Sequence, residues 1–346
     1  MEMLSTVLPS TSGGDTATTL MPEAVTFRPT QPYRNVLNTV AEESCPGYCG
    51  RIPSSDGNSS TCAACPWGSR VETGGPYCSP CNSPIEIYAW LYLLLVALAP
   101  CLFHCLHVRR SVQMFKKHPV SAELAEHLCI ILECALAAVA ALLVFEPYGS
   151  LQLHACRPSR IKQWYTWMHN PTVRFSKTIP CAHEVVYPLQ SLPIVYLVFC
   201  LINTLVLRTI LYAVYVRKHR PARSYYASLF TLPLLGVVNI LASGAIYHVF
   251  PYVIAVYSLA GQAMHFAYLK PISRADLWEK MFKTPRELTH MIVLMGLFGF
   301  SIVSLMVRNG PDDWTVICGF LGLVLAPPIF FTLTPVLTHP IAVNGH

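Results

Sequence analysis

Six closely spaced cysteines near the amino terminus are the residues whose type and spacing most clearly indicate chemistry. Their gaps are three, twelve, two, twelve and two residues, in segments that read CPGYCG, CAAC and CSPC: Cys45, Cys49, Cys62, Cys65, Cys78 and Cys81. A segment this short buries too little apolar surface to fold unaided, so cross-links must stabilise it. Two kinds of cross-link fit the pattern, namely three disulfides or a zinc ion held by CxxC pairs.

The compartment distinguishes these two possibilities. Asn58, which is followed by Ser59 and Ser60, is the one N-glycosylation sequon of the chain and lies within the cysteine segment. A glycosylated segment faces an oxidising compartment, where disulfides form and persist, so we favour disulfides over zinc. The six cysteines allow fifteen pairings, which spacing alone does not resolve.

Two further cysteines, Cys156 and Cys181, lie in a long polar loop over residues 146–188. We expect them to bond to each other, closing 24 intervening residues and contributing roughly 3 kcal/mol. The alternative is two free thiols.

Glu133 is the acidic residue nearest the middle of an apolar stretch, in LCIILECALAAVAALLVF. A carboxyl group in a membrane either stays protonated or finds a partner. It could contact a proton, an ion or a substrate, but the simpler interpretation, which we favour, is a carboxyl group that holds helices together. The alanines that follow it suit close helix packing.

The long loop carries two further groups of candidate residues. His183 and Glu184 precede the third apolar stretch and could bind a metal or act as acid and base, although no HExxH motif is present. The second group is aromatic and lies in WYTWMHNP: Trp164, Tyr165 and Trp167. These side chains either anchor the loop at a membrane interface or form a recognition surface for an unfolded or partner protein.

The sequence lacks the motifs of the main enzyme and nucleotide-binding classes. A serine elbow, paired intramembrane aspartates and a Gly-rich phosphate loop are all missing, and no basic stripe suggests nucleic acid. We therefore expect a protein that is not an enzyme and has no metal or other cofactor.

Composition indicates a polytopic membrane protein, because 53% of the residues are hydrophobic and 12% are charged, against about 25% charged in soluble proteins. Seven apolar stretches are each long enough to cross about 30 Å of hydrocarbon as a helix. They lie at 86–107, 124–145, 189–208, 227–248, 250–269, 288–307 and 314–335. The fourth and fifth adjoin each other, and Pro251 supplies the break.

The domain organisation follows from these stretches. We expect a disordered extension over residues 1–44, a cysteine-rich module over 45–84, and a membrane domain of seven helices over 85–346. With the amino terminus in the lumen, thirteen basic residues fall in the cytosolic loops and one, Arg308, in a short lumenal loop. This asymmetry predicts a lumenal amino terminus and a cytosolic carboxyl terminus.

With these features in place, the chain resembles the c-Jun N-terminal kinase associated membrane protein family from about residue 45 to 346. The resemblance is carried by CPGYCG, CAACPWGSR, CSPC, IYAWLYL, ILECALAA, LLVFEPYG, WYTWMHNP, CAHEVVYPL, FPYVIAVYSL and the terminal NGH, in this order. The motifs are specific when taken together.

The resemblance implies a seven-span protein of the endoplasmic reticulum membrane, with the plasma membrane as a second location. It implies a non-enzymatic adaptor in the degradation of misfolded proteins, with proteasome subunits, a membrane ubiquitin ligase, misfolded membrane proteins and the stress kinase JNK as partners. Two alternatives remain open from the residues alone: a seven-transmembrane receptor with a cysteine-rich ectodomain, or a transporter centred on Glu133.

Overall fold

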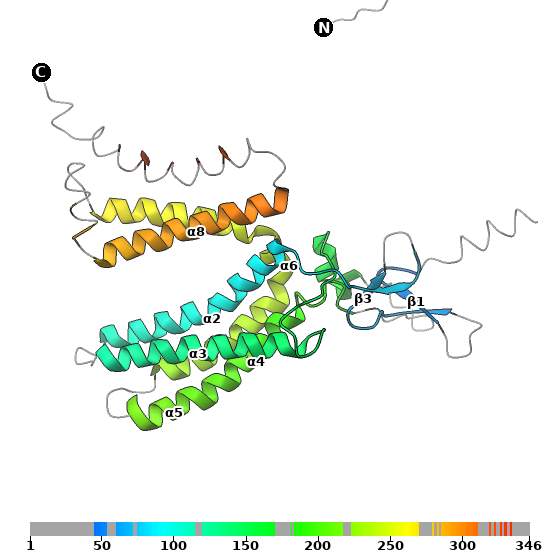
Figure 1. The fold of residues 1–346 in the computed structure, drawn as a ribbon, viewed down its shortest axis with the longest axis horizontal. Helices are drawn as coiled ribbons and strands as arrows, with labels where there is room; N and C mark the ends of the chain where they lie inside the picture. Colours follow the sequence, from blue (N-terminus) through cyan, green and yellow to red (C-terminus); the bar gives the residue numbers. More distant parts are fainter. Residues whose placement is uncertain are drawn as a thin grey trace, which may run out of the picture. The chain divides into compact units, whose positions relative to one another are not determined.

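In the computed structural model, helices form a bundle with a small β-containing module and a long loop at one end (Figure 1). The structure describes residues 45–53, 60–71, 75–114, 120–169, 181, 183–216, 223–269 and 285–310, with scattered residues between 279 and 333. Contacts divide the chain into residues 1–44 and 45–346. The predicted disordered extension and the sequon at Asn58 lie outside the described residues, and only scattered residues of the seventh apolar stretch are described.

Five helices among the described residues are long and apolar enough to cross a membrane. Their most apolar segments have mean hydropathies of 2.0–2.4. In a hydrocarbon environment every backbone N–H and C=O group must be hydrogen-bonded, and a continuous helix meets this requirement. They are α2 (Ile87–Met114), α3 (Val120–Val144), α4 (Ser191–Asn203) with its extension to residue 216, α6 (Arg223–Leu269) and α8 (Pro285–Asn309).

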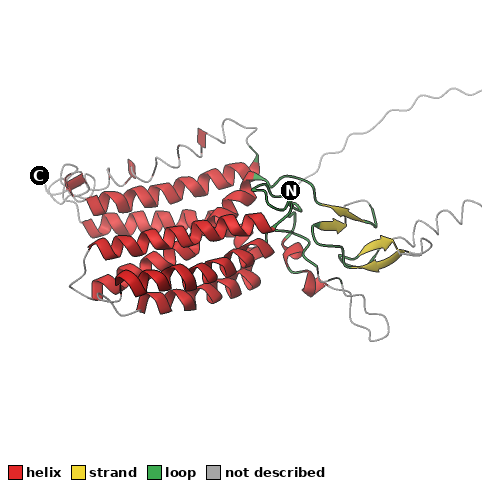
Figure 2. Ribbon diagram, turned by 60° about the horizontal axis from the view of Figure 1, so that its bottom comes forward, coloured by secondary structure: helices red, strands yellow, loops and turns green. Residues whose placement is uncertain are grey.

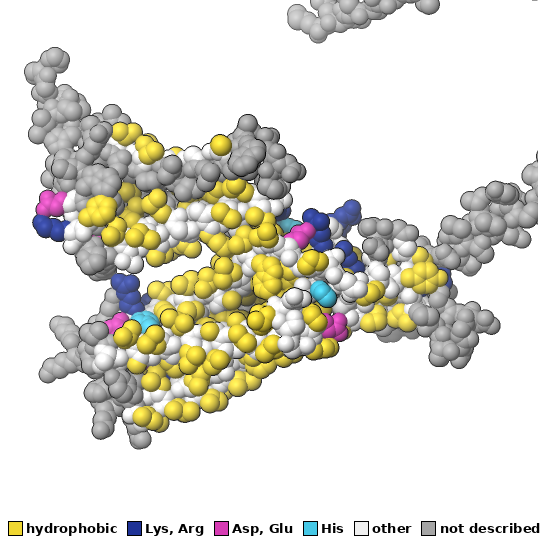
Figure 3. All heavy atoms as spheres, in the orientation of Figure 1, with side chains coloured by type: hydrophobic (Ala, Val, Ile, Leu, Met, Phe, Trp, Pro, Cys, Tyr) yellow, Lys and Arg dark blue, Asp and Glu magenta, His cyan; other side chains and the backbone are white. Residues whose placement is uncertain are grey.

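The extension of α4 consists of the π-helix η3 (Thr204–Arg208), the short α5 (Thr209–Leu211) and a second π-helix, η4 (Tyr212–Val216). The outer surface of the bundle fits a hydrocarbon environment. Hydrophobic side chains cover the visible face of the helices, and charged side chains gather towards their two ends (Figure 3).

Helix α6 provides both the fourth and the fifth predicted stretches. Its 47 residues would span about 70 Å if straight, more than twice the thickness of a bilayer core. It contains Pro251, which cannot donate to the helical ladder. Figure 1 shows the helix turning back near this point, so that its second half runs beside α8 over the length of the bundle. Seven crossings stay a prediction, because only scattered residues of the seventh stretch are described.

The cysteine-rich module consists of two small antiparallel ribbons, β1 (Gly50–Pro53) with β2 (Ser60–Ala63) and β3 (Ser69–Val71) with β4 (Cys78–Pro80). Ribbons of two strands are marginal in water by themselves. Gly50 lies against the disulfide between Cys65 and Cys78, where an added Cβ would approach the Cys78 sulfur to 2.3 Å, so the module is built around this cross-link.

The disulfide pairing differs from the expected one and fastens the module to the long loop. Two bonds lie within the module, Cys45–Cys62 and Cys65–Cys78. The other two reach the loop, Cys49–Cys181 and Cys81–Cys156. The predicted bond between Cys156 and Cys181 is therefore wrong. Spacing suggested it because the two lie alone in one loop, but the folded loop runs along the module, where the Ala155 N–H donates to the Ser83 carbonyl at 3.0 Å.

The module and the loop thus lie at the same end of the bundle (Figure 2). At this end the loop inserts Trp164, which is 1% exposed, between α2 and α6. Its ring lies 5.1 Å from that of Tyr247 and 6.0 Å from that of Tyr92. Gly244 makes room for it, because a Cβ there would approach Trp164 to 2.7 Å. The aromatic cluster closes the core of the bundle beneath the loop.

Candidate functional site

Glu133 forms a buried ion pair with Arg208, which comes from a different helix. Arg208 Nη2 donates to Glu133 Oε2 at 2.5 Å and its Nε donates to Oε1 at 3.0 Å, a bidentate arrangement. The side chains are 3% and 1% exposed. Because a desolvated bidentate pair is strong but costly to break, these two residues must stay together in the folded protein.

Side chains from four segments complete this polar cluster. Thr204 Oγ1 donates to Glu133 Oε2 at 3.0 Å, and the Cys129 thiol donates to Oε1 at 3.3 Å. The guanidinium of Arg208 also donates to Ser228 Oγ at 2.6 Å and contacts His104 Nδ1 at 3.2 Å. The cluster therefore joins α2, α3, η3 and α6.

The local structure of η3 places Thr204 and Arg208 beside the Glu133 carboxylate. The segment is a π-helix, and π-turns are commonly found at functional sites. Thr204 is the first residue of η3 and Arg208 is the last. Both donate hydrogen bonds to the Glu133 carboxylate. Asn203, just before η3, donates to the Glu133 carbonyl at 3.0 Å, which fixes the register of α3 against this segment.

The arrangement favours the structural interpretation of Glu133. Its two oxygens accept four hydrogen bonds, so the group is saturated as an ionised acceptor. Glu133 was predicted from the sequence, whereas its neighbours in the cluster were not: Arg208, His104, Thr204 and Ser228. The signal for Arg208 was present, since an arginine inside an apolar stretch needs a partner as much as a glutamate does.

The aromatic residues of the loop serve different purposes. Trp164 is buried in the core, Tyr165 is partly buried against it, and Trp167 is 60% exposed. The structure therefore separates one core anchor from one side chain that is available to a partner or to a membrane surface. Met168, next to Trp167, is 62% exposed and extends the same apolar surface.

Glu184 caps the start of α4. Its Oε1 accepts hydrogen bonds from the backbone N–H groups of Gln190 at 2.9 Å and Ser191 at 3.0 Å, where a helix leaves donors unsatisfied. His183 is 8% exposed, and its carbonyl accepts from Thr166 Oγ1 at 2.9 Å. Within the described part of the chain, no group of three or more His, Cys, Asp or Glu side chains is arranged to hold a metal ion.

Burial raises the pKa of the Glu184 carboxyl above its usual 4.5, and the hydrogen bonds from Ser191 and Gln190 partly offset the rise. The folded state therefore holds this proton to higher pH than the unfolded state does, so the contribution to stability is full below pH 4.5 and is lost as pH rises through the raised pKa. Glu184→Gln keeps the capping oxygen and removes the titration.

We expect the difference in unfolding free energy between wild type and Glu184→Gln to change with pH above 4.5, moving in favour of the variant. Thermal unfolding of both purified proteins across this range measures it. Burial lowers the pKa of His183, but this group is common to both proteins and cancels in the difference. A constant difference would contradict the assignment.

Comparison with known proteins covers most of the chain. The family model described as JNK1/MAPK8-associated membrane protein matches residues 45–340. The JNK1/MAPK8-associated membrane protein of Mus musculus is 31% identical over 312 residues, which cover 86% of this chain and 96% of the relative. The protein of the same name from Homo sapiens is 30% identical with the same coverage, and the homolog from Caenorhabditis elegans is 29% identical over 86% of this chain and 94% of its own length.

No solved structure matches the chain. The family match spans the cysteine-rich module, the loop that is bonded to it and the helices that carry the buried ion pair. The chain belongs to the family of JNK1/MAPK8-associated membrane proteins.

Proposed function

We propose that this protein is a multi-pass adaptor of the endoplasmic reticulum membrane that acts in the degradation of misfolded membrane proteins and modulates signalling by the kinase JNK. The observation that carries the proposal is the family match over residues 45–340, whose relatives are named for association with JNK1. The proposed cytosolic partners are proteasome subunits, a membrane ubiquitin ligase and JNK. The basic loops that would meet them fall largely outside the described residues.

The disulfides support a lumenal position for the module and the loop. Eight cysteines at one end of the bundle are bonded in four pairs, a state that belongs to an oxidising compartment. This agrees with the orientation proposed from the basic residues, with the amino terminus in the lumen and the carboxyl terminus in the cytosol.

The buried polar cluster bears on the alternative of a transporter centred on Glu133. Both oxygens of the Glu133 carboxylate already accept hydrogen bonds, which come from Arg208, Thr204 and Cys129. A transported ion would have to displace one of these partners in a desolvated site. The adaptor proposal needs no such exchange.

Affinity purification of the full chain from gently solubilised membranes tests the adaptor proposal. We expect proteasome and ubiquitin-ligase subunits to remain bound, and the glycan on Asn58 to be sensitive to endoglycosidase H, as expected for residence in the endoplasmic reticulum. A resistant glycan on protein at the cell surface, without these subunits, would instead support the receptor alternative.

The exposed apolar surface of Trp167 and Met168 is the part of the loop that we assign to recognition of unfolded protein. Because truncating an interface aromatic commonly costs more than 1 kcal/mol, Trp167→Ala should weaken capture of a misfolded membrane protein by roughly tenfold. The measurement is quantitative co-precipitation of such a client. The matched control is Ile161→Ala, also exposed in the same loop, and equal effects of both changes would argue against a specific surface.

A further inference from the structure

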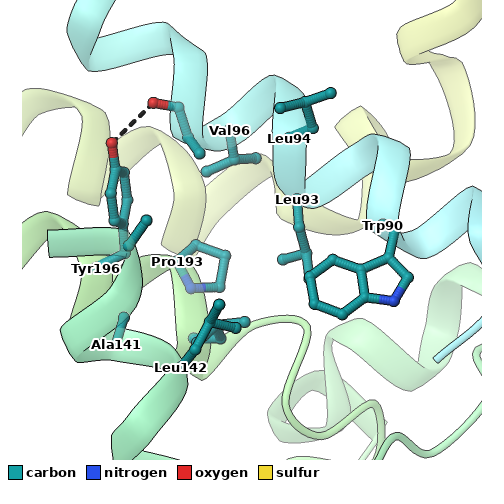
Figure 4. A pocket seen from close by; sticks show the side chains of 11 residues that line it. Trp90, Leu93, Leu94, Val96, Ala141, Leu142, Pro193 and Tyr196 are labelled. Carbon is teal, nitrogen blue, oxygen red and sulfur yellow. Dashed lines mark hydrogen bonds between the residues drawn. The ribbon is translucent and has the colours of Figure 1, made fainter. Parts of the chain in front are cut away.

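An apolar cavity of about 190 Å³ lies between α2, α3 and α4 (Figure 4). Helix α2 contributes Trp90, Leu93, Leu94, Val96 and Ala97, α3 contributes Ala138, Ala141 and Leu142, and α4 contributes Leu192, Pro193 and Tyr196. All of these residues belong to the membrane-spanning helices. The rim residues Trp90 and Leu94 are 38% and 47% exposed, so the cavity reaches the lipid-facing surface.

Small side chains leave this space open. The alanines after Glu133 predicted close helix packing, and Ala137 and Ala141 are indeed fully buried. Ala138 is only partly buried, and together with Ala141 it lines the cavity. On α2, Pro100 cannot bond to the Val96 carbonyl, which weakens the ladder next to the cavity wall.

The polar groups at the cavity are already satisfied or point elsewhere. Tyr196 is hydrogen-bonded through its hydroxyl to the Ala97 carbonyl at 2.7 Å. Trp90 presents its six-membered ring to the space, with the ring nitrogen directed away (Figure 4). A water molecule needs two to four polar partners, so water gains little here. The chemistry of the lining selects a hydrocarbon.

We propose that this cavity binds a segment of one phospholipid acyl chain from the surrounding bilayer. Engineered apolar cavities of about 150 Å³ stay dry and bind benzene, so a cavity of this volume holds several methylene groups. Pockets for drug-sized or rigid multi-ring ligands are typically about 300–1,000 Å³, which favours a flexible chain over a sterol. The inference does not depend on the proposed adaptor function.

Photolabelling of the full chain in lipid nanodiscs tests the proposal. The probe is phosphatidylcholine with a diazirine on one acyl chain, and mass spectrometry maps the labelled residues. We expect a preferred site at the cavity, with labelling that saturates as the probe fraction rises and is competed by unlabelled phospholipid. Ala138→Leu should reduce it roughly tenfold, equivalent to the lost burial of about two methylene groups.

Ala135→Leu is the matched control, because Ala135 lies on the same helix but is exposed and does not line the cavity. It should leave labelling unchanged. The proposal is overturned if label spreads over lipid-facing residues of α3 such as Leu136 and Val139 and rises linearly without saturation. It is also overturned if a diazirine sterol labels the cavity in place of the phospholipid. Saturation and competition are measured on wild type, so the test does not depend on the folding of Ala138→Leu.

Discussion

Replacing Glu133 with glutamine lowers the stability of the helix bundle by about 3–5 kcal/mol, because it leaves the Arg208 guanidinium buried without a counter-charge. The substitution preserves shape and one acceptor oxygen, so the loss reports charge and not packing. Fluorescence-monitored unfolding of the purified protein in detergent measures the effect. Glu123→Gln is the matched control on the same helix, since Glu123 is partly exposed and pairs weakly with His127 at 3.8 Å.

The reciprocal change should cost less. Arg208→Gln leaves a buried carboxyl group, which can become neutral by taking up a proton, whereas a guanidinium cannot lose one in a protein. The double variant should recover much of the loss, because a buried ion pair can be replaced as a unit. Additive effects of the two changes would show that the residues act independently.

Removing the disulfide between Cys49 and Cys181 has the second large expected effect. The bond joins cysteines 132 residues apart, and closing such a loop contributes up to about 5 kcal/mol in the chain-entropy model. This is an upper bound, because the segment between the two cysteines includes α2 and α3, which stay inserted in the membrane after unfolding. The double variant Cys49→Ala with Cys181→Ala should lower the unfolding temperature and make the loop accessible to protease.

The pair Cys65 and Cys78 provides the matched control. Cys65 is buried and Cys78 is partly buried, and the two lie only 13 residues apart, for which the same model gives about 3 kcal/mol. Its removal should loosen the module while leaving Trp164 buried beneath the loop. If both double variants made the loop equally accessible to protease, then the bond to Cys181 would have no special part in holding the loop.

The lengths of apolar stretches in the sequence largely determined the helices. Stretches 86–107, 124–145 and 288–307 coincide closely with α2, α3 and α8, because each continuous run of apolar residues can satisfy its backbone groups within one helix. Pro251 likewise indicated a bend inside α6, since a proline cannot donate a hydrogen bond to the helical ladder.

The partners of the chemically important residues depended on the tertiary structure. The cysteine pattern identified the residues that form disulfides, but the exchange of partners between module and loop follows from how the loop packs along the strands. The position of Glu133 in an apolar stretch predicted either a protonated carboxyl group or a partner, and the register of η3 against α3 decided that it has a partner, Arg208. Trp164 and Trp167 lie three residues apart, yet one is buried and the other exposed.

The cavity between α2, α3 and α4 shows the same division. The alanines that line it were visible as a small-residue stripe, which is equally consistent with tight packing and with a void. Hydropathy and residue spacing are properties of a single segment. They therefore predict which helix or loop each residue belongs to. Contacts arise between segments far apart in the chain, so packing of side chains in the folded bundle decided which groups meet.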